Sequence, residues 1–266
     1  MGKAVIVSDA AAGLTDALEM ELRGHLAKGF DRVTTKQFLK DGAHDATFPA
    51  WRGLLADCDV YHHIGHGQIR CTRHNQAFDV NVMYKGLLGN YPWCCPEDAG
   101  RHSELEAISG TMQSAEHARK LIERAGKRAR QLSAAEAAHL AEGYLMFGAE
   151  ELTIGPADVA RLDAAPRALV YLSCCVGAWD EKLPMAFINK GTRYVIAYKR
   201  YADDRLSVAT SMAFYAYWKQ LGFEVDAIPT AYKDVVLEVG YPLHPALYEL
   251  GNVTTANDSL DPAIKP

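Results

Sequence analysis

The chain has 266 residues, of which 49% are hydrophobic and 23% are charged, and its formal net charge is −5 with histidines counted as neutral. This composition is ordinary for a globular protein and excludes collagen-like, coiled-coil and disordered chains. A slightly acidic chain lacks the electrostatic footprint of a nucleic-acid or membrane-surface protein, so we expect neither partner. The sequence has no apolar run of about 18 residues and no signal-peptide architecture at its start. We therefore expect a cytoplasmic protein.

Cysteines occur at six positions: 58, 71, 94, 95, 174 and 175. The chain is too long and too poor in cysteine to depend on disulfides for its fold. We therefore expect thiols, whose uses are packing, metal binding or nucleophilic attack.

Short apolar runs alternate with amphipathic segments along the chain. The apolar runs predict strands at 3–9, 59–64, 168–172 and 194–197 and a small hairpin from 144–147 and 152–154. Periodic apolar spacing predicts helices at 14–26, 49–56, 156–162, 183–189, 204–221 and 226–239. Residues 75–100 are interpreted as irregular, 103–141 as two helices, and the residues after 239 as a tail. Strands that alternate with helices predict an α/β fold with a mostly parallel central sheet.

Two of the predicted strands end in chemically reactive residues. His66 follows strand 59–64 within Gly65-His66-Gly67, and the pair Cys174-Cys175 follows strand 168–172. Ligands bind at the carboxyl ends of the strands in sheets of this kind. If these two strands are neighbours, the imidazole and the thiol meet at one edge of the sheet.

An imidazole and a thiol at that edge have the chemistry for acyl transfer. A cysteine attacks a carbonyl as thiolate, and a nearby histidine supplies the base or the stabilising imidazolium. Backbone N–H groups must also face the developing oxyanion. The glycines that flank both segments, Gly67 and Gly177, would allow the backbone to approach a substrate closely.

The two segments resemble those of a known family. The run Asp59-Val-Tyr-His-His-Ile-Gly-His-Gly67 resembles the histidine segment of CHAT-type caspase-like cysteine peptidases of clan CD. The run Ala168-Leu-Val-Tyr-Leu-Ser-Cys-Cys-Val-Gly177 is similar to their cysteine segment. Leu152–Val159 and Ala186–Ala197 look like the elements that flank that segment, and the resemblance covers about 48–70 and 144–235.

The resemblance implies a single caspase-like domain over residues 1–266. Its fold would be a three-layer α/β/α sandwich with a mostly parallel central sheet and a helical insertion at about 75–141. It implies a cysteine endopeptidase in which Cys175 is the nucleophile and His66 the acid/base. The N–H groups of Gly67 and Cys175 would form the oxyanion hole. The expected partners are a protein or peptide substrate and a regulatory protein, and no metal or other cofactor is implied.

The sequence does not decide which substrate side chain such a peptidase would prefer. Asp180, Asp203 or Asp204 would suit a basic substrate residue, whereas Lys199 or Arg200 would suit an acidic one. Asp204 is equally explained as an N-cap of the following helix.

Two other hypotheses about function remain besides a cysteine peptidase. The chain could be a catalytically inactive caspase-like scaffold that binds a partner. It could also hold zinc through His62, His66 and Cys71 with Cys94 or Cys95, as in a zinc-dependent hydrolase. For His62 and its neighbour His63 we favour a packing role, with one ring inside and one outside as strand alternation demands.

Overall fold

The computed structural model describes residues 2–9, 15–39, 44–71, 141–147, 151–175, 177–178, 181–199, 204–240 and 245–255. Contacts divide the chain into two compact units, Met1–Gly67 with Gly143–Pro266 and the intervening Gln68–Glu142. The helical insertion expected at about 75–141 falls in the second unit and lies outside the described residues, except that Ala141 begins a strand. Within the described residues, none of the helices is both long and apolar enough to cross a membrane.

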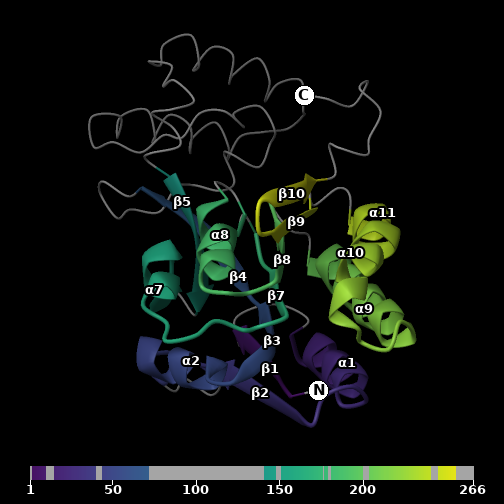
Figure 1. Ribbon diagram of the computed structural model, residues 1–266. Helices are drawn as coiled ribbons and strands as arrows, with labels where there is room; N and C mark the ends of the chain where they lie inside the picture. Colours follow the sequence, from purple (N-terminus) through teal and green to yellow (C-terminus); the bar gives the residue numbers. More distant parts are fainter. Residues whose placement is uncertain are drawn as a thin grey trace, which may run out of the picture. The chain divides into compact units, whose positions relative to one another are not determined.

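The first unit is an α/β structure built on a seven-stranded sheet of order β10-β9-β8-β7-β3-β1-β2 (Figure 1). Its strands are β1 (Lys3–Asp9), β2 (Arg32–Phe38), β3 (Cys58–Ile64), β7 (Leu169–Ser173), β8 (Tyr194–Tyr198), β9 (Pro245–Glu249) and β10 (Asn252–Thr255). The five strands from β2 to β8 are parallel, whereas β9 and β10 are antiparallel. The predicted, mostly parallel central sheet is therefore confirmed.

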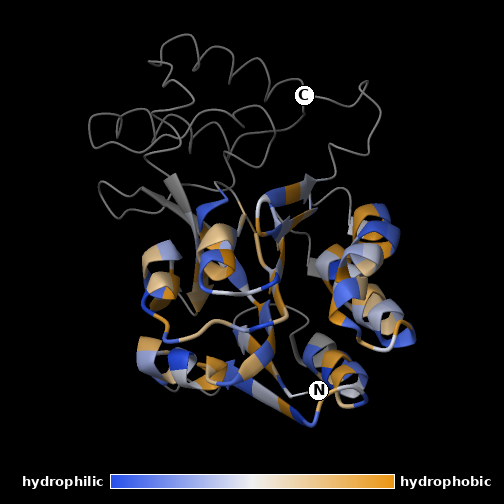
Figure 2. Ribbon diagram, in the orientation of Figure 1, coloured by the Kyte–Doolittle hydropathy of each residue, from blue (hydrophilic) through white to orange (hydrophobic). Residues whose placement is uncertain are grey.

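Helices cover both faces of this sheet (Figure 1). On one face lie α1 (Thr15–Leu26), α9 (Asp204–Gln220), α10 (Ile228–Ala231) and α11 (Leu237–Gly240), and on the other α2 (Phe48–Leu55), α7 (Pro156–Ala160) and α8 (Lys182–Asn189). These helices carry both hydrophilic and hydrophobic residues, as amphipathic helices do (Figure 2). Because both faces are covered, β1, β3, β7 and β8 are buried along almost their whole length.

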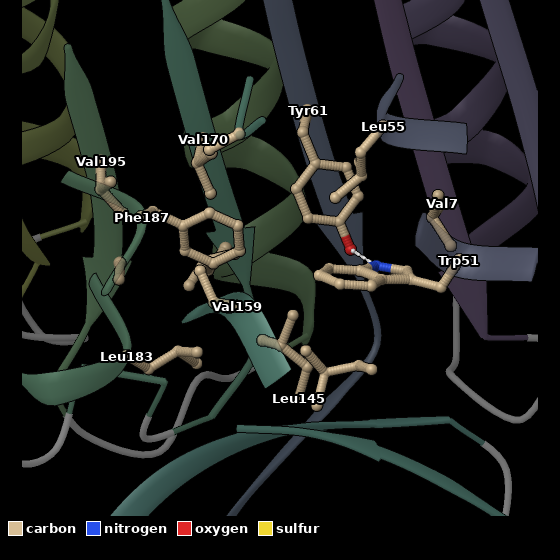
Figure 3. Packing of buried hydrophobic residues seen from close by; sticks show 14 of the residues in the cluster. Val7, Trp51, Leu55, Tyr61, Leu145, Val159, Val170, Leu183, Phe187 and Val195 are labelled. Atoms are coloured by element: carbon tan, nitrogen blue, oxygen red, sulfur yellow. Dashed lines mark hydrogen bonds between the residues drawn. The ribbon is translucent and has the colours of Figure 1, made fainter. Parts of the chain in front are cut away.

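Alternate residues of the central strands enter two separate cores. In β7, Leu169 and Tyr171 contribute to the core beneath α1 and α9, while Val170 and Leu172 contribute to the core beneath α2 and α8. Figure 3 shows the second core, in which the Trp51 indole points at the Tyr61 hydroxyl. Strand β3 thus lies between two apolar layers.

Several elements differ from the sequence-based expectation. Strand β2 was not predicted, because its Thr, Lys and Gln residues give no apolar run at this edge of the sheet. The prediction that the residues after 239 form a tail was wrong, since β9 and β10 form an antiparallel hairpin that extends the sheet. The helix expected at 226–239 is a composite of a 3-10 turn (Val225–Ala227), α10, a π-helical segment (Tyr232–Val236) and α11.

The expected small hairpin is present, and its apolar side chains join the core beneath α2 and α8. Strands β5 (Ala141–Phe147) and β6 (Leu152–Ile154) pair antiparallel, and a three-stranded sheet has the order β4-β5-β6. Strand β4 (His66–Cys71) begins directly after a bend at Gly65. His66 therefore opens a new strand rather than lying in a loop.

Candidate active site

The expected meeting of the two reactive segments depends on whether β3 and β7 are neighbours, and they are. They pair in parallel, with Ile64 opposite Ser173. Just past this pair, the Gly65 N–H donates to the Ser173 carbonyl oxygen at 3.2 Å. His66 follows Ile64 by two residues, and Cys175 follows Ser173 by two. The carboxyl ends of the two strands therefore bring both residues to one edge of the sheet, as predicted.

The backbones of the two segments touch at Gly67. A Cβ atom on Gly67 would lie well inside van der Waals contact of the Cys175 carbonyl oxygen, and 3.1 Å from Cys174 Sγ. A Cβ atom on Gly177 would lie 2.9 Å from the same sulfur. Glycine at both positions is thus required by close packing around the cysteine pair.

The two adjacent cysteines have different surroundings. Cys174 is 1% exposed, and burial raises the pKa of its thiol well above the usual range, so it stays protonated and unreactive. Cys175 is partly exposed. Of the two cysteines, only Cys175 is partly open to solvent, and it also packs against the core beneath α1 and α9. Its role as the nucleophile stays a prediction.

The carboxyl end of a third strand lies beside these two segments, and the sequence did not lead us to predict it as part of the site. Strand β1 runs parallel to β3 with Ser8 opposite Ile64, and Asp9 follows. The Asp9 Cβ atom is 3.2 Å from where a Cβ atom on Gly65 would stand, and the Asp9 side chain is buried. A carboxylate therefore joins the imidazole and the thiol at this edge. The polar pair Ser8-Asp9 at the end of the first apolar run was the available signal.

The expected specificity residues are only partly described. Asp180, Asp203 and Arg200 lie outside the described residues, and Asp204 is the first residue of α9 with its side chain likewise outside. Lys199 Nζ donates to Glu181 Oε1 at 2.6 Å. An acidic substrate side chain would have to compete with Glu181 for that ammonium group.

The two consecutive histidines of β3 are both fully buried, which corrects the expectation that one ring faces outward. Their rings do alternate, but each face of the sheet is covered. His62 stacks on Tyr171 with ring centroids 4.8 Å apart, and His63 meets the Phe147 ring edge-on at 4.9 Å.

The described residues do not support the zinc-site hypothesis. Both ring nitrogens of His62 are engaged with hydroxyl groups, Nδ1 with Tyr215 at 3.1 Å and Nε2 with Ser173 at 2.9 Å. No group of three potential metal ligands is found among the described side chains. The side chain of Cys71, and Cys94 and Cys95, which that hypothesis also used, lie outside them.

The buried histidines predict a pH-dependent stability. Burial lowers the pKa of His63 to about 4 and that of His62 well below its ordinary value of 6.5. Between pH 6.5 and about 4 the unfolded chain therefore binds protons that the folded chain does not, so stability falls as the pH drops through this window.

For His63 the loss is on the order of 3 kcal/mol at the acid end of the window. Denaturant unfolding at pH 7, 6 and 5 measures it, and His63→Gln should flatten the dependence. An unfolding free energy that is constant over this range would contradict the neutral, buried state of both rings.

No protein-family model matches the chain, and no curated protein matches it.

Proposed function

We propose that the chain is a caspase-like cysteine endopeptidase of the CHAT type, with Cys175 and His66 as its catalytic dyad. The observation that carries the proposal is the contact between the two segments: Gly67 packs directly against the Cys175 backbone at the ends of paired strands. The seven-stranded α/β sheet with helices on both faces agrees with a three-layer sandwich.

In the proposed reaction the Cys175 thiolate attacks the carbonyl carbon of the scissile peptide bond. The carbonyl π electrons move onto oxygen, and the N–H groups of Gly67 and Cys175 donate to that oxyanion. The C–N bond then breaks as the His66 imidazolium gives its proton to the leaving amine, which leaves a thioester. His66 takes a proton from water, the hydroxide attacks the thioester, and the acid and the thiolate are released.

The proposal is tested with an electrophilic peptide ketone that carries an affinity label. We expect covalent capture at Cys175, mapped by mass spectrometry of the digested adduct, and a lower capture rate in His66→Ala. Capture at Cys174 instead would move the nucleophile by one residue, and no capture in any state of the protein would favour the inactive scaffold.

A further inference from the structure

Strand β3 places one histidine against each of the two segments of the candidate site. We refer to Gly65–Gly67 as the histidine segment and to Ser173–Cys175 as the cysteine segment. His63 reaches the first through the His66 carbonyl, and His62 reaches the second through Ser173. The two contacts lie on opposite faces of the same strand.

His63 belongs to a chain of hydrogen bonds that begins in α2 and ends at the His66 carbonyl oxygen. The Trp51 indole N–H donates to the Tyr61 hydroxyl at 3.0 Å (Figure 3), and that hydroxyl lies 3.4 Å from His63 Nδ1. His63 Nε2 lies 3.4 Å from the His66 carbonyl oxygen. An indole N–H only donates and a carbonyl only accepts. The proton of His63 must therefore sit on Nε2, while Nδ1 accepts from Tyr61.

His62 belongs to a second buried network, on the side of α9. Its Nε2 lies 2.9 Å from Ser173 Oγ, which lies 2.8 Å from Ser211 Oγ. The backbone carbonyl of Ser173 also accepts the Gly65 N–H. Ser173 is thus held through its side chain by His62 and through its main chain by the histidine segment, directly before the two cysteines.

Packing alone does not explain two polar rings at these positions. Both are 0% exposed between apolar layers, where aliphatic side chains would fill the space without desolvating a polar group. Burial keeps each ring neutral. A neutral imidazole has one donor nitrogen and one acceptor nitrogen, and the hydrogen-bond partners of each ring engage both. What the rings add beyond packing is a fixed position for the backbone at each strand end.

We propose that His62 and His63 are positioning residues, His62 for the cysteine segment and His63 for the histidine segment. The inference rests on the proposed function for its catalytic consequence. Without these bonds the Cys175 thiol and the His66 imidazole would lose the alignment that proton transfer requires, since displacements of about 1 Å at such sites already slow a reaction strongly.

The test compares leucine with glutamine at each position. Leucine fills a similar volume without polar atoms, whereas the glutamine amide keeps an N–H donor. We expect His62→Leu and His63→Leu to lower kcat by about 3- to 10-fold at unchanged KM, the effect of losing one hydrogen bond. Glutamine should restore most of the rate at either position. Equal kcat in the leucine variants and the wild type, or glutamine as slow as leucine at equal stability, would overturn the inference.

Two measurements keep the inference testable if a leucine variant fails to fold. Nitrogen-15 NMR of the wild type should show the proton of His63 on Nε2, and a proton on Nδ1 would overturn the His63 assignment. Ser173→Ala removes the partner of His62 without changing either ring, and it should lower kcat to a similar extent. Wild-type kcat in Ser173→Ala would overturn the His62 assignment.

A failure of the proposed function is distinguishable from a failure of this inference. If the wild type cleaves no peptide, the proposed peptidase falls, and the variants are compared by the rate at which iodoacetamide alkylates Cys175. That rate should still drop in the leucine variants and recover with glutamine, because a displaced His66 no longer favours the thiolate. Unchanged alkylation rates would reject the positioning role by itself.

Discussion

Replacing Cys175 with alanine is expected to abolish peptide cleavage while the protein still folds. In the proposed mechanism Cys175 forms the covalent intermediate, so its loss should lower kcat by more than about a thousandfold, as loss of the nucleophile does in covalent hydrolases. Cys175 is partly exposed at the end of β7, and its removal leaves no large cavity in the core. The measurement is the turnover of a peptide library by wild type and variant, with circular dichroism as the check on folding.

The neighbouring cysteine provides the matched control. Cys174→Ala removes a buried sulfur packed against Gly67 and Gly177, which should reduce stability by about 1 kcal/mol and leave most of the activity. Full activity in Cys175→Ala would reject the assignment of the nucleophile. Loss of activity in Cys174→Ala alone would move the nucleophile by one residue.

Replacing Gly67 with alanine is expected to damage stability and activity together. The added methyl group would overlap the Cys175 carbonyl oxygen, which belongs to the backbone and cannot rotate away. Separating the two segments should lower the free energy of unfolding by about 1–3 kcal/mol. It should also misplace a proposed oxyanion donor, with a loss in kcat of roughly a hundredfold or more. Thermal unfolding and peptide turnover measure the two effects.

Gly53 is a matched control for the same substitution. It lies in α2, and a Cβ atom there would meet nothing within 4 Å. Gly53→Ala should therefore leave activity unchanged and raise stability by about 0.5–1 kcal/mol, because alanine favours a helix over glycine. If Gly67→Ala behaved like Gly53→Ala, the two segments could not be in the close contact on which the proposed site depends.

The sequence by itself predicted the elements whose residues are apolar in a regular pattern. Strands β1, β3, β7 and β8 are continuous apolar runs because helices cover both sheet faces, and α9 shows the spacing of a helix packed on one side. The reactive residues at the ends of β3 and β7 were also apparent, since polar residues that interrupt an apolar run stand out. Such local signals established the fold class and the pairing of His66 with Cys175 as a hypothesis.

Only the tertiary structure decided which strands are neighbours and which polar groups meet. Strand β2 lies at an edge of the sheet, and β9 begins shortly after Gly240 and Pro242, so neither had the apolar run of a central strand. The burial of both His62 and His63, and the place of Asp9 beside Gly65, depend on strand order and on layers contributed by distant segments. Strand order arises from contacts far apart in the chain, whereas periodicity records only the immediate surroundings of each residue.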